Sequence, residues 1–126
     1  MDFFNTSISQ KSFEYVEKVL TSTFVSAGKV AIDFEKELSA TLGLVNPVSV
    51  NSGTSALHLG LAVAGVKHGD EVILPAQTFV ATGLAVLMQG ATPVFADIQY
   101  ETGNIDPNSI SQKITEKTKA IMPVHW

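Results

Sequence analysis

Hydrophobic residues recur at helical spacing in the first third of the chain. The segment Gln10–Ser22 places three apolar residues on one helical face: Phe13, Val16 and Leu20. The segment Lys29–Leu42 does the same with a second set: Val30, Phe34, Leu38 and Leu42. We therefore expect the chain to open with two amphipathic helices.

After these helices, short β-rich runs alternate with runs rich in alanine and leucine. Glycine, proline and aspartate punctuate the pattern, so the β-rich runs predict strands and the others predict helices. We expect Asp106 to cap the last helix, because a capping aspartate followed by proline is a favoured helix start. The expected strands are Pro47–Val50, Glu71–Pro75, Pro93–Asp97 and Thr118–Val124, and the expected helices are Ala56–Ala64, Thr78–Gln89 and Pro107–Thr115.

This alternation predicts the fold class. Strands separated by single helices are typical of right-handed β-α-β crossovers and a parallel sheet. We expect an α/β fold of three layers, with a mostly parallel sheet and helices on both faces. A parallel strand must be covered on both faces, and nothing follows the last one. Residues 1–126 are therefore expected to be an N-terminal segment and the first half of a larger domain.

Composition narrows the possible functions. With 45% hydrophobic residues the chain can bury one core, and no apolar run approaches the ~18–20 residues of a membrane span. The N-terminus lacks a signal-peptide pattern, so the cytoplasm is the expected location. The net charge is −4 and the basic residues are scattered lysines, so nucleic-acid binding is not expected. Cysteine is absent and the three histidines share no ligand spacing, so no metal site is expected.

The segment Ser49–Ala56 is the sharpest candidate for chemistry. A strand that ends on small hydroxyl residues and starts a helix leaves unpaired N–H groups, which favour an anion such as phosphate. Gly53 permits close backbone approach, while Thr54 and Ser55 can add hydroxyl donors. The same residues also fit a simple helix cap at Ser52 or Thr54, so both interpretations stay open. The spacing matches neither a Walker A loop nor a dinucleotide-binding glycine motif.

A second candidate follows the strand Glu71–Pro75. Phe79 falls at the carboxyl end of that strand, on the edge where doubly wound sheets bind ligands. An aromatic ring beside an anion site suits a phosphorylated planar cofactor, but a core phenylalanine fits the sequence as well. Asp97 ends the next strand and faces either the site or a turn. His58 lies within an apolar helix, where a core histidine is expected.

Five motifs follow one another along the chain: VNSGTSALH from Val50, GDEVILP from Gly69, TFVAT from Thr78, GATPVFAD from Gly90 and TKAIMPVH from Thr118. Taken in this order, they resemble the DegT/DnrJ/StrS aminotransferases. The resemblance extends upstream through Phe24–Val30 and Phe34–Leu38, and so covers nearly the whole chain. One departure is Ala27-Gly28-Lys29, where the family commonly has Thr-Gly-Pro near the substrate.

The resemblance implies an enzyme of fold type I that uses pyridoxal 5'-phosphate (PLP). In such enzymes the Ser-Gly-Thr turn holds the cofactor phosphate, which implies that role for Gly53, Thr54 and Ser55. An aromatic residue stacks on the pyridine ring, which implies that role for Phe79. The family's Schiff-base lysine lies beyond Trp126, so no catalytic residue is assigned and the segment alone is expected to be inactive.

The family also implies substrates and partners. Its members mostly transfer an amino group from an amino-acid donor to a nucleotide-linked keto-sugar, often for surface polysaccharide or another modified sugar, and are usually homodimers. Two alternatives stay open. One is a sugar dehydratase of the same family, in which histidine replaces the Schiff-base lysine. The other is a non-catalytic α/β module that binds an anion.

Overall fold

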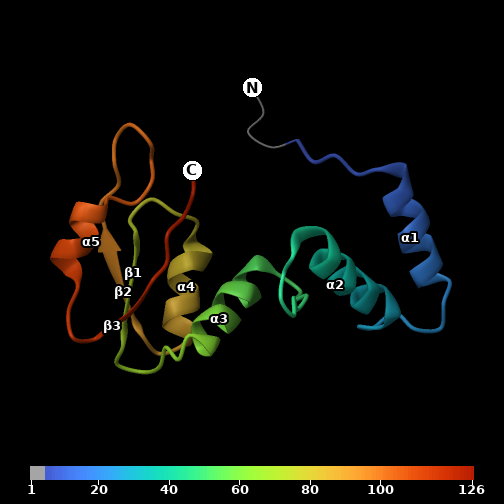
Figure 1. Cartoon of the computed structure of the whole chain (residues 1–126), viewed down its shortest axis with the longest axis horizontal. Helices are drawn as coiled ribbons and strands as arrows, with labels where there is room; N and C mark the ends of the chain where they lie inside the picture. The colour runs from blue at the N-terminus through green and yellow to red at the C-terminus, as the bar shows by residue number, and fades with distance from the viewer. Residues whose placement is uncertain (1–4) are drawn as a thin grey trace. The chain divides into compact units, whose positions relative to one another are not determined.

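The structure is a computed structural model that describes residues 5–126. The chain divides into two compact units, Met1–Ser49 and Val50–Trp126, which are described separately. Figure 1 traces both units along the sequence. No helix among the described residues is long and apolar enough to cross a bilayer.

The first unit contains two helices, α1 (Gln10–Leu20) and α2 (Lys29–Leu42). The side chain of Ser9 caps α1, and α2 ends at Gly43, whose φ of 67° is left-handed. The prediction of two helices is confirmed, with α1 ending two residues early. Neither helix has a buried residue, and the apolar residues predicted for their faces are exposed, except for the half-buried Leu38.

The predicted strand Pro47–Val50 is wrong, because these residues adopt no regular structure. A strand needs a neighbour for its backbone N–H groups, and at Ser49 a side chain takes that place. The backbone N–H and the hydroxyl of Ser49 both donate to Oε1 of Glu35, at 2.7 and 2.6 Å. These hydrogen bonds, led by the hydroxyl, lower the pKa of the Glu35 carboxyl.

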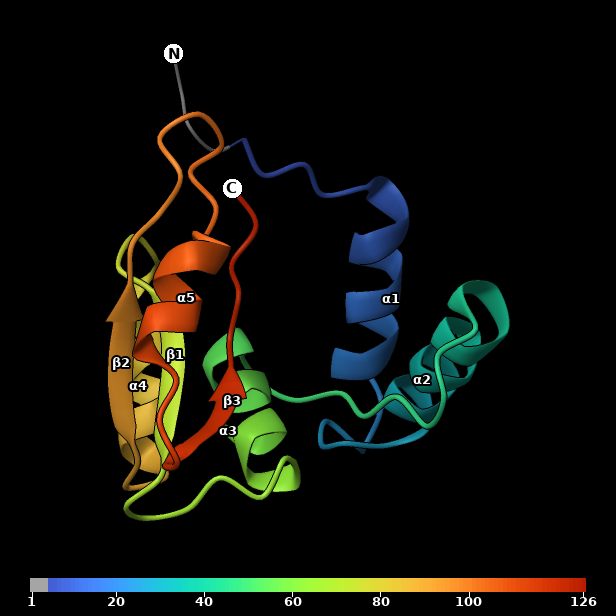
Figure 2. The ribbon, with the colours of Figure 1, turned by 60° about the vertical axis from the view of Figure 1, so that its left-hand side comes forward.

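The second unit is a parallel sheet with helices on both faces, as predicted. Its strands lie in the order β2-β1-β3 and all pair in parallel. Figure 2 shows α5 on one face of the sheet and α4 on the other. The strands are β1 (Glu71–Pro75), β2 (Thr92–Ala96) and β3 (Thr118–Ile121), and the helices are α3 (Gly53–Val63), α4 (Val80–Met88) and α5 (Pro107–Lys113).

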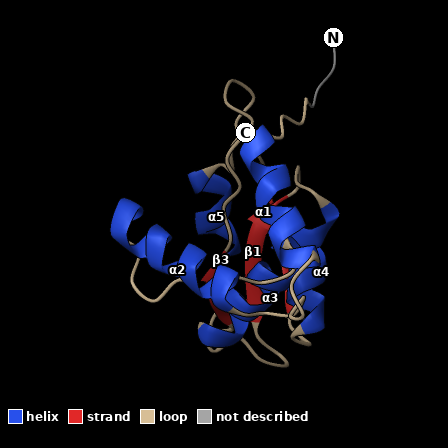
Figure 3. Cartoon of the chain, turned by 90° about the vertical axis from the view of Figure 1, so that its right-hand side faces the viewer, coloured by secondary structure: helices blue, strands red, loops and turns tan. Residues whose placement is uncertain are grey.

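The core lies on the two faces of β1, because alternate side chains of a strand point to opposite sides. Val72 and Leu74 pack with residues of α3 and α4, whereas Ile73 packs on the opposite face. Figure 3 shows the strands of this unit with α3, α4 and α5 beside them. The first cluster includes Leu61, Ala85 and Val86, and the second includes Ala96, Ile105 and, partly buried, Ile110.

Element boundaries differ from the predicted ones near the ends of strands and helices. Helix α3 begins at Gly53, three residues before the predicted start, and α4 begins at Val80 rather than Thr78. Strand β3 ends at Ile121 and not at Val124. The predicted cap at Asp106 is confirmed, since its side chain accepts a hydrogen bond from Asn108 N at 3.0 Å.

Candidate functional site

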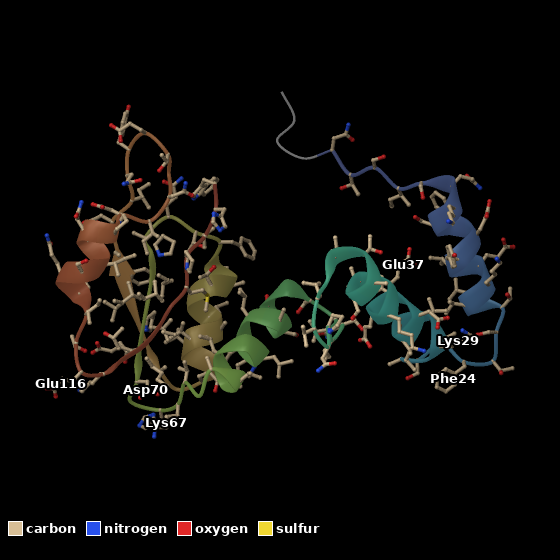
Figure 4. The ribbon with its side chains drawn as sticks, in the orientation of Figure 1. Phe24, Lys29, Glu37, Lys67, Asp70 and Glu116 are labelled. Carbon is tan, nitrogen blue, oxygen red and sulfur yellow. The ribbon has the colours of Figure 1, made fainter. Side chains whose placement is uncertain are left out.

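The two candidate segments begin neighbouring helices at the same edge of the sheet. Helix α3 precedes β1 in the chain and α4 follows it. Both helices therefore run opposite to β1 and start near its carboxyl end (Figure 1). The helices pack together, and Gln89 Nε2 donates to the carbonyl oxygen of His58 at 3.1 Å. Figure 4 shows the charged residues Lys67, Asp70 and Glu116 at the opposite edge.

That hydrogen bond joins the C-cap residue of α4 to the middle of α3. Gly53 precedes His58 by five residues, about 7.5 Å of helix, and Val80 precedes Gln89 by nine, about 13.5 Å. Both helix starts therefore lie well before this hydrogen bond along their helices. Phe79, just before α4, and the turn at Gly53 therefore belong to the same edge of the sheet.

The first turn of α3 is capped from within the segment 51–55. Ser52 Oγ accepts from Ser55 N at 3.1 Å, and the two hydroxyl oxygens lie 2.9 Å apart. Ser55 Oγ donates to Oδ1 of Asn51 at 2.7 Å. Because Ser55 has one hydroxyl hydrogen, the Ser52 hydroxyl is the donor between the two serines. The cap expected at Ser52 is therefore present, and both serine hydroxyl hydrogens are engaged.

Two other backbone N–H groups of the same turn are not used by this cap. The N–H groups of Gly53 and Thr54 have no hydrogen-bond partner among residues 5–126. A Cβ atom built on Gly53 would meet nothing within 4 Å, so the space above that residue is open. The turn therefore caps its helix and still presents two N–H groups at a helix N-terminus, where a negative charge is favoured.

Phe79 is not a core residue, because its side chain is 76% exposed. It is the N-cap residue of α4, and its carbonyl oxygen accepts from Thr82 N at 3.0 Å. The hydroxyls of Thr78 and Thr82 are 2.8 Å apart and partly buried. The backbone around Phe79 is thus held at the start of α4 while its ring is accessible.

Asp97 anchors a neighbouring helix. Its backbone N–H donates to Ser109 Oγ at 3.0 Å, and its carboxylate lies 3.4 Å from the same hydroxyl. Ser109 is buried on α5, so Asp97 ties the end of β2 to that helix. Residues 5–126 contain no cluster of three histidine, cysteine, aspartate or glutamate side chains that could hold a metal ion.

The structure adds Trp126 and its contacts to this edge, which the sequence interpretation missed. Trp126 Nε1 donates to the carbonyl oxygen of Gln77 at 3.3 Å, and Trp126 N donates to Oδ1 of Asn104 at 3.1 Å. A Cβ built on Gly103 would lie 3.3 Å from Cγ of the indole, so the ring packs on a bare Cα. The signal was a tryptophan placed shortly after a predicted strand end, on the edge where ligands bind.

Comparison with known proteins identifies relatives of this chain. It is 43% identical to the spore coat polysaccharide biosynthesis protein SpsC of Bacillus subtilis (strain 168), over 94% of this chain and 31% of that protein. It is 42% identical to GDP-perosamine synthase of Escherichia coli O157:H7, over 97% of this chain and 34% of the relative. The chain thus spans about a third of the length of these curated relatives.

Solved structures show the same fold at similar identity. The sugar aminotransferase Spr1654 of Streptococcus pneumoniae, solved in a PMP form, superposes with a TM-score of 0.89 and 38% identity, over 98% of this chain and 31% of the other. Its PLP form gives a TM-score of 0.88. The family model for DegT/DnrJ/EryC1/StrS aminotransferases matches residues 6–126. The chain is therefore a member of the DegT/DnrJ/EryC1/StrS aminotransferase family.

Proposed function

We propose that this chain is the N-terminal third of a PLP-dependent sugar aminotransferase, in which it supplies the phosphate turn and one wall of the cofactor site. The observation that carries the proposal is the pair of unpaired N–H groups on Gly53 and Thr54, at the ligand-binding edge of a family-typical fold. The proposed domain assignment is that residues 1–126 comprise the N-terminal segment and the first half of the PLP-binding large domain.

The residues at this edge fit a phosphorylated cofactor. Gly53 and Thr54 offer backbone donors in open space, and the Thr54 hydroxyl can add a third donor. Each charge-assisted hydrogen bond to phosphate contributes about 1.5–3 kcal/mol, and the helix dipole adds up to ~2 kcal/mol. Ser55 joins the site only if its hydroxyl turns away from Asn51, 2.7 Å from it here.

Phe79 would supply the ring contact. Its exposed side chain can stack on a planar pyridine in offset geometry, worth about 0.5–1.5 kcal/mol beyond area burial. The chain's part is thus to bind the phosphate and orient the ring. When bound, PLP supplies the electron sink that lets an amino group pass from an amino-acid donor to a keto-sugar.

The substrate class follows from the relatives. GDP-perosamine synthase and SpsC bear names that refer to a nucleotide sugar and to a coat polysaccharide, so a nucleotide-linked keto-sugar is the substrate that we propose. We propose a homodimer in the cytoplasm as the working form. The amino donor is an amino acid, and the product enters surface polysaccharide or another modified sugar.

The test uses the complete reading frame that contains this chain. With PLP added, the purified protein should acquire a visible absorption band and a higher melting temperature, and should transfer an amino group from glutamate to a nucleotide-linked keto-sugar. A protein that stays colourless and whose melting temperature ignores PLP would refute the proposal. Cofactor binding combined with sugar dehydration and no amino transfer would instead favour the dehydratase.

A further inference from the structure

The loop between β1 and α4 is fixed at nearly every residue. Ala76 N donates to the carbonyl oxygen of Ala96 at 2.9 Å, which extends the pairing of β1 with β2 by one residue. At the other end of the loop, the first turn of α4 holds Phe79 through its carbonyl. Between these anchors lies Gln77, whose carbonyl oxygen accepts from the indole of Trp126. Trp126 therefore holds the carbonyl group two residues before Phe79.

Trp126 is itself held by a separate loop. Its backbone N–H donates to Asn104 Oδ1, and its ring packs on Gly103. That loop is ordered by its own hydrogen bonds, Gln99 N to Asn104 O at 2.9 Å and Gly103 N to Gln99 O at 2.9 Å, and by the bridge between Ile98 and Ile105. The indole thus connects an ordered loop to the loop that carries Phe79.

We propose that Trp126 is a positioning residue, which holds the loop that carries Phe79 through the Gln77 carbonyl and so fixes the position of the Phe79 ring. The site then favours ligands that carry a ring over bare phosphate. This inference rests on the proposed function, since it concerns the same cofactor site. The Gly53–Thr54 donors lie on a different helix and make no hydrogen bond to Trp126 or its loop. Loss of the indole contact should therefore weaken binding of the ring and leave phosphate binding unchanged.

The experiment compares two ligands on the complete protein by isothermal titration calorimetry. Pyridoxamine 5'-phosphate carries both ring and phosphate and does not condense with lysines, and inorganic phosphate carries the anion alone. Trp126→Phe keeps a ring against Gly103 but removes the Nε1–H donor. Because one hydrogen bond is lost, Trp126→Phe should weaken the affinity for pyridoxamine 5'-phosphate about 2- to 10-fold and leave the affinity for inorganic phosphate unchanged.

A matched pair at Asn104 tests the same connection from its other end. Asn104→Leu removes the acceptor for Trp126 N, whereas Asn104→Asp retains an oxygen in that place. Asn104→Leu should reproduce the selective loss, and Asn104→Asp should restore the parent affinity. The free energy of unfolding from urea titration shows whether each variant is folded.

The outcomes separate this inference from the proposed function. A parent protein that binds neither ligand refutes both. If the parent binds pyridoxamine phosphate and the variants bind it equally well, Trp126 has no effect on the site, and the positioning role alone is refuted. If the variants lose both ligands equally, Trp126 affects the whole fold, and the positioning role is again refuted. Selective loss of the ring-bearing ligand in Trp126→Phe and Asn104→Leu supports it.

Discussion

The proposed phosphate contact at Gly53 and Thr54 yields the sharpest prediction, which concerns the backbone N–H of Thr54. Thr54→Pro removes that donor while leaving the helix able to form, because proline is tolerated in the first turn of a helix. One charge-assisted hydrogen bond of about 1.5–3 kcal/mol corresponds to roughly a 10- to 150-fold loss of affinity. We expect that loss for both pyridoxamine 5'-phosphate and inorganic phosphate.

Two control variants isolate the backbone contribution. Thr54→Ala keeps the N–H and removes only the hydroxyl, so it should weaken phosphate binding less than Thr54→Pro. Phe79→Leu removes the ring and should leave inorganic phosphate unaffected. Calorimetric titration of the complete protein measures all three affinities, and urea unfolding checks that each variant is folded. Equal affinities for Thr54→Pro and its parent would show that the turn is a helix cap and nothing more.

Three further predictions concern stability and ionisation. Leu74 is fully buried on β1, so Leu74→Ala should lower the free energy of unfolding by about 2–5 kcal/mol in urea titration; a change below 1 kcal/mol would contradict that packing. Asp106→Ala removes the cap of α5 and should cost about 0.5–2 kcal/mol by the same measurement, whereas Asp106→Asn should cost little. The Glu35 carboxyl should titrate below its ordinary pKa of 4.5 in NMR, so its hydrogen bonds stabilise the fold above that pH and are lost as the pH falls through the lowered pKa. Ser49→Ala should raise that pKa toward 4.5, and an unchanged value would place the cause elsewhere.

Local signals were enough to predict most helices and strands of the second unit. The aspartate–proline start of α5 was predicted because it needs only neighbouring residues. Strand β1 was predicted with correct bounds because its three central residues, buried on both faces, form a continuous apolar run. The layered fold followed from the order of these elements.

The strand predicted at Pro47–Val50 failed because strand formation depends on a partner that the local pattern does not reveal. Its β-rich composition suits extended backbone, but the Ser49 donors go to Glu35, which precedes it by 14 residues on a helix. Trp126 was missed for the same reason, since its contacts reach Gln77 and Asn104, which are 49 and 22 residues away in sequence. Contacts at such separation require the folded chain.

The turn at Gly53 shows why the sequence alone could not decide between a helix cap and an anion site. A helix start leaves several N–H groups without intrahelical partners, and one side-chain cap satisfies only one of them. Ser52 takes the N–H of Ser55, which leaves those of Gly53 and Thr54 for another acceptor. Capping therefore does not compete with phosphate for the same donors. Because the cap holds the first turn in helical form, it also fixes the direction of the two remaining N–H groups, so the cap is compatible with the phosphate contact that we propose.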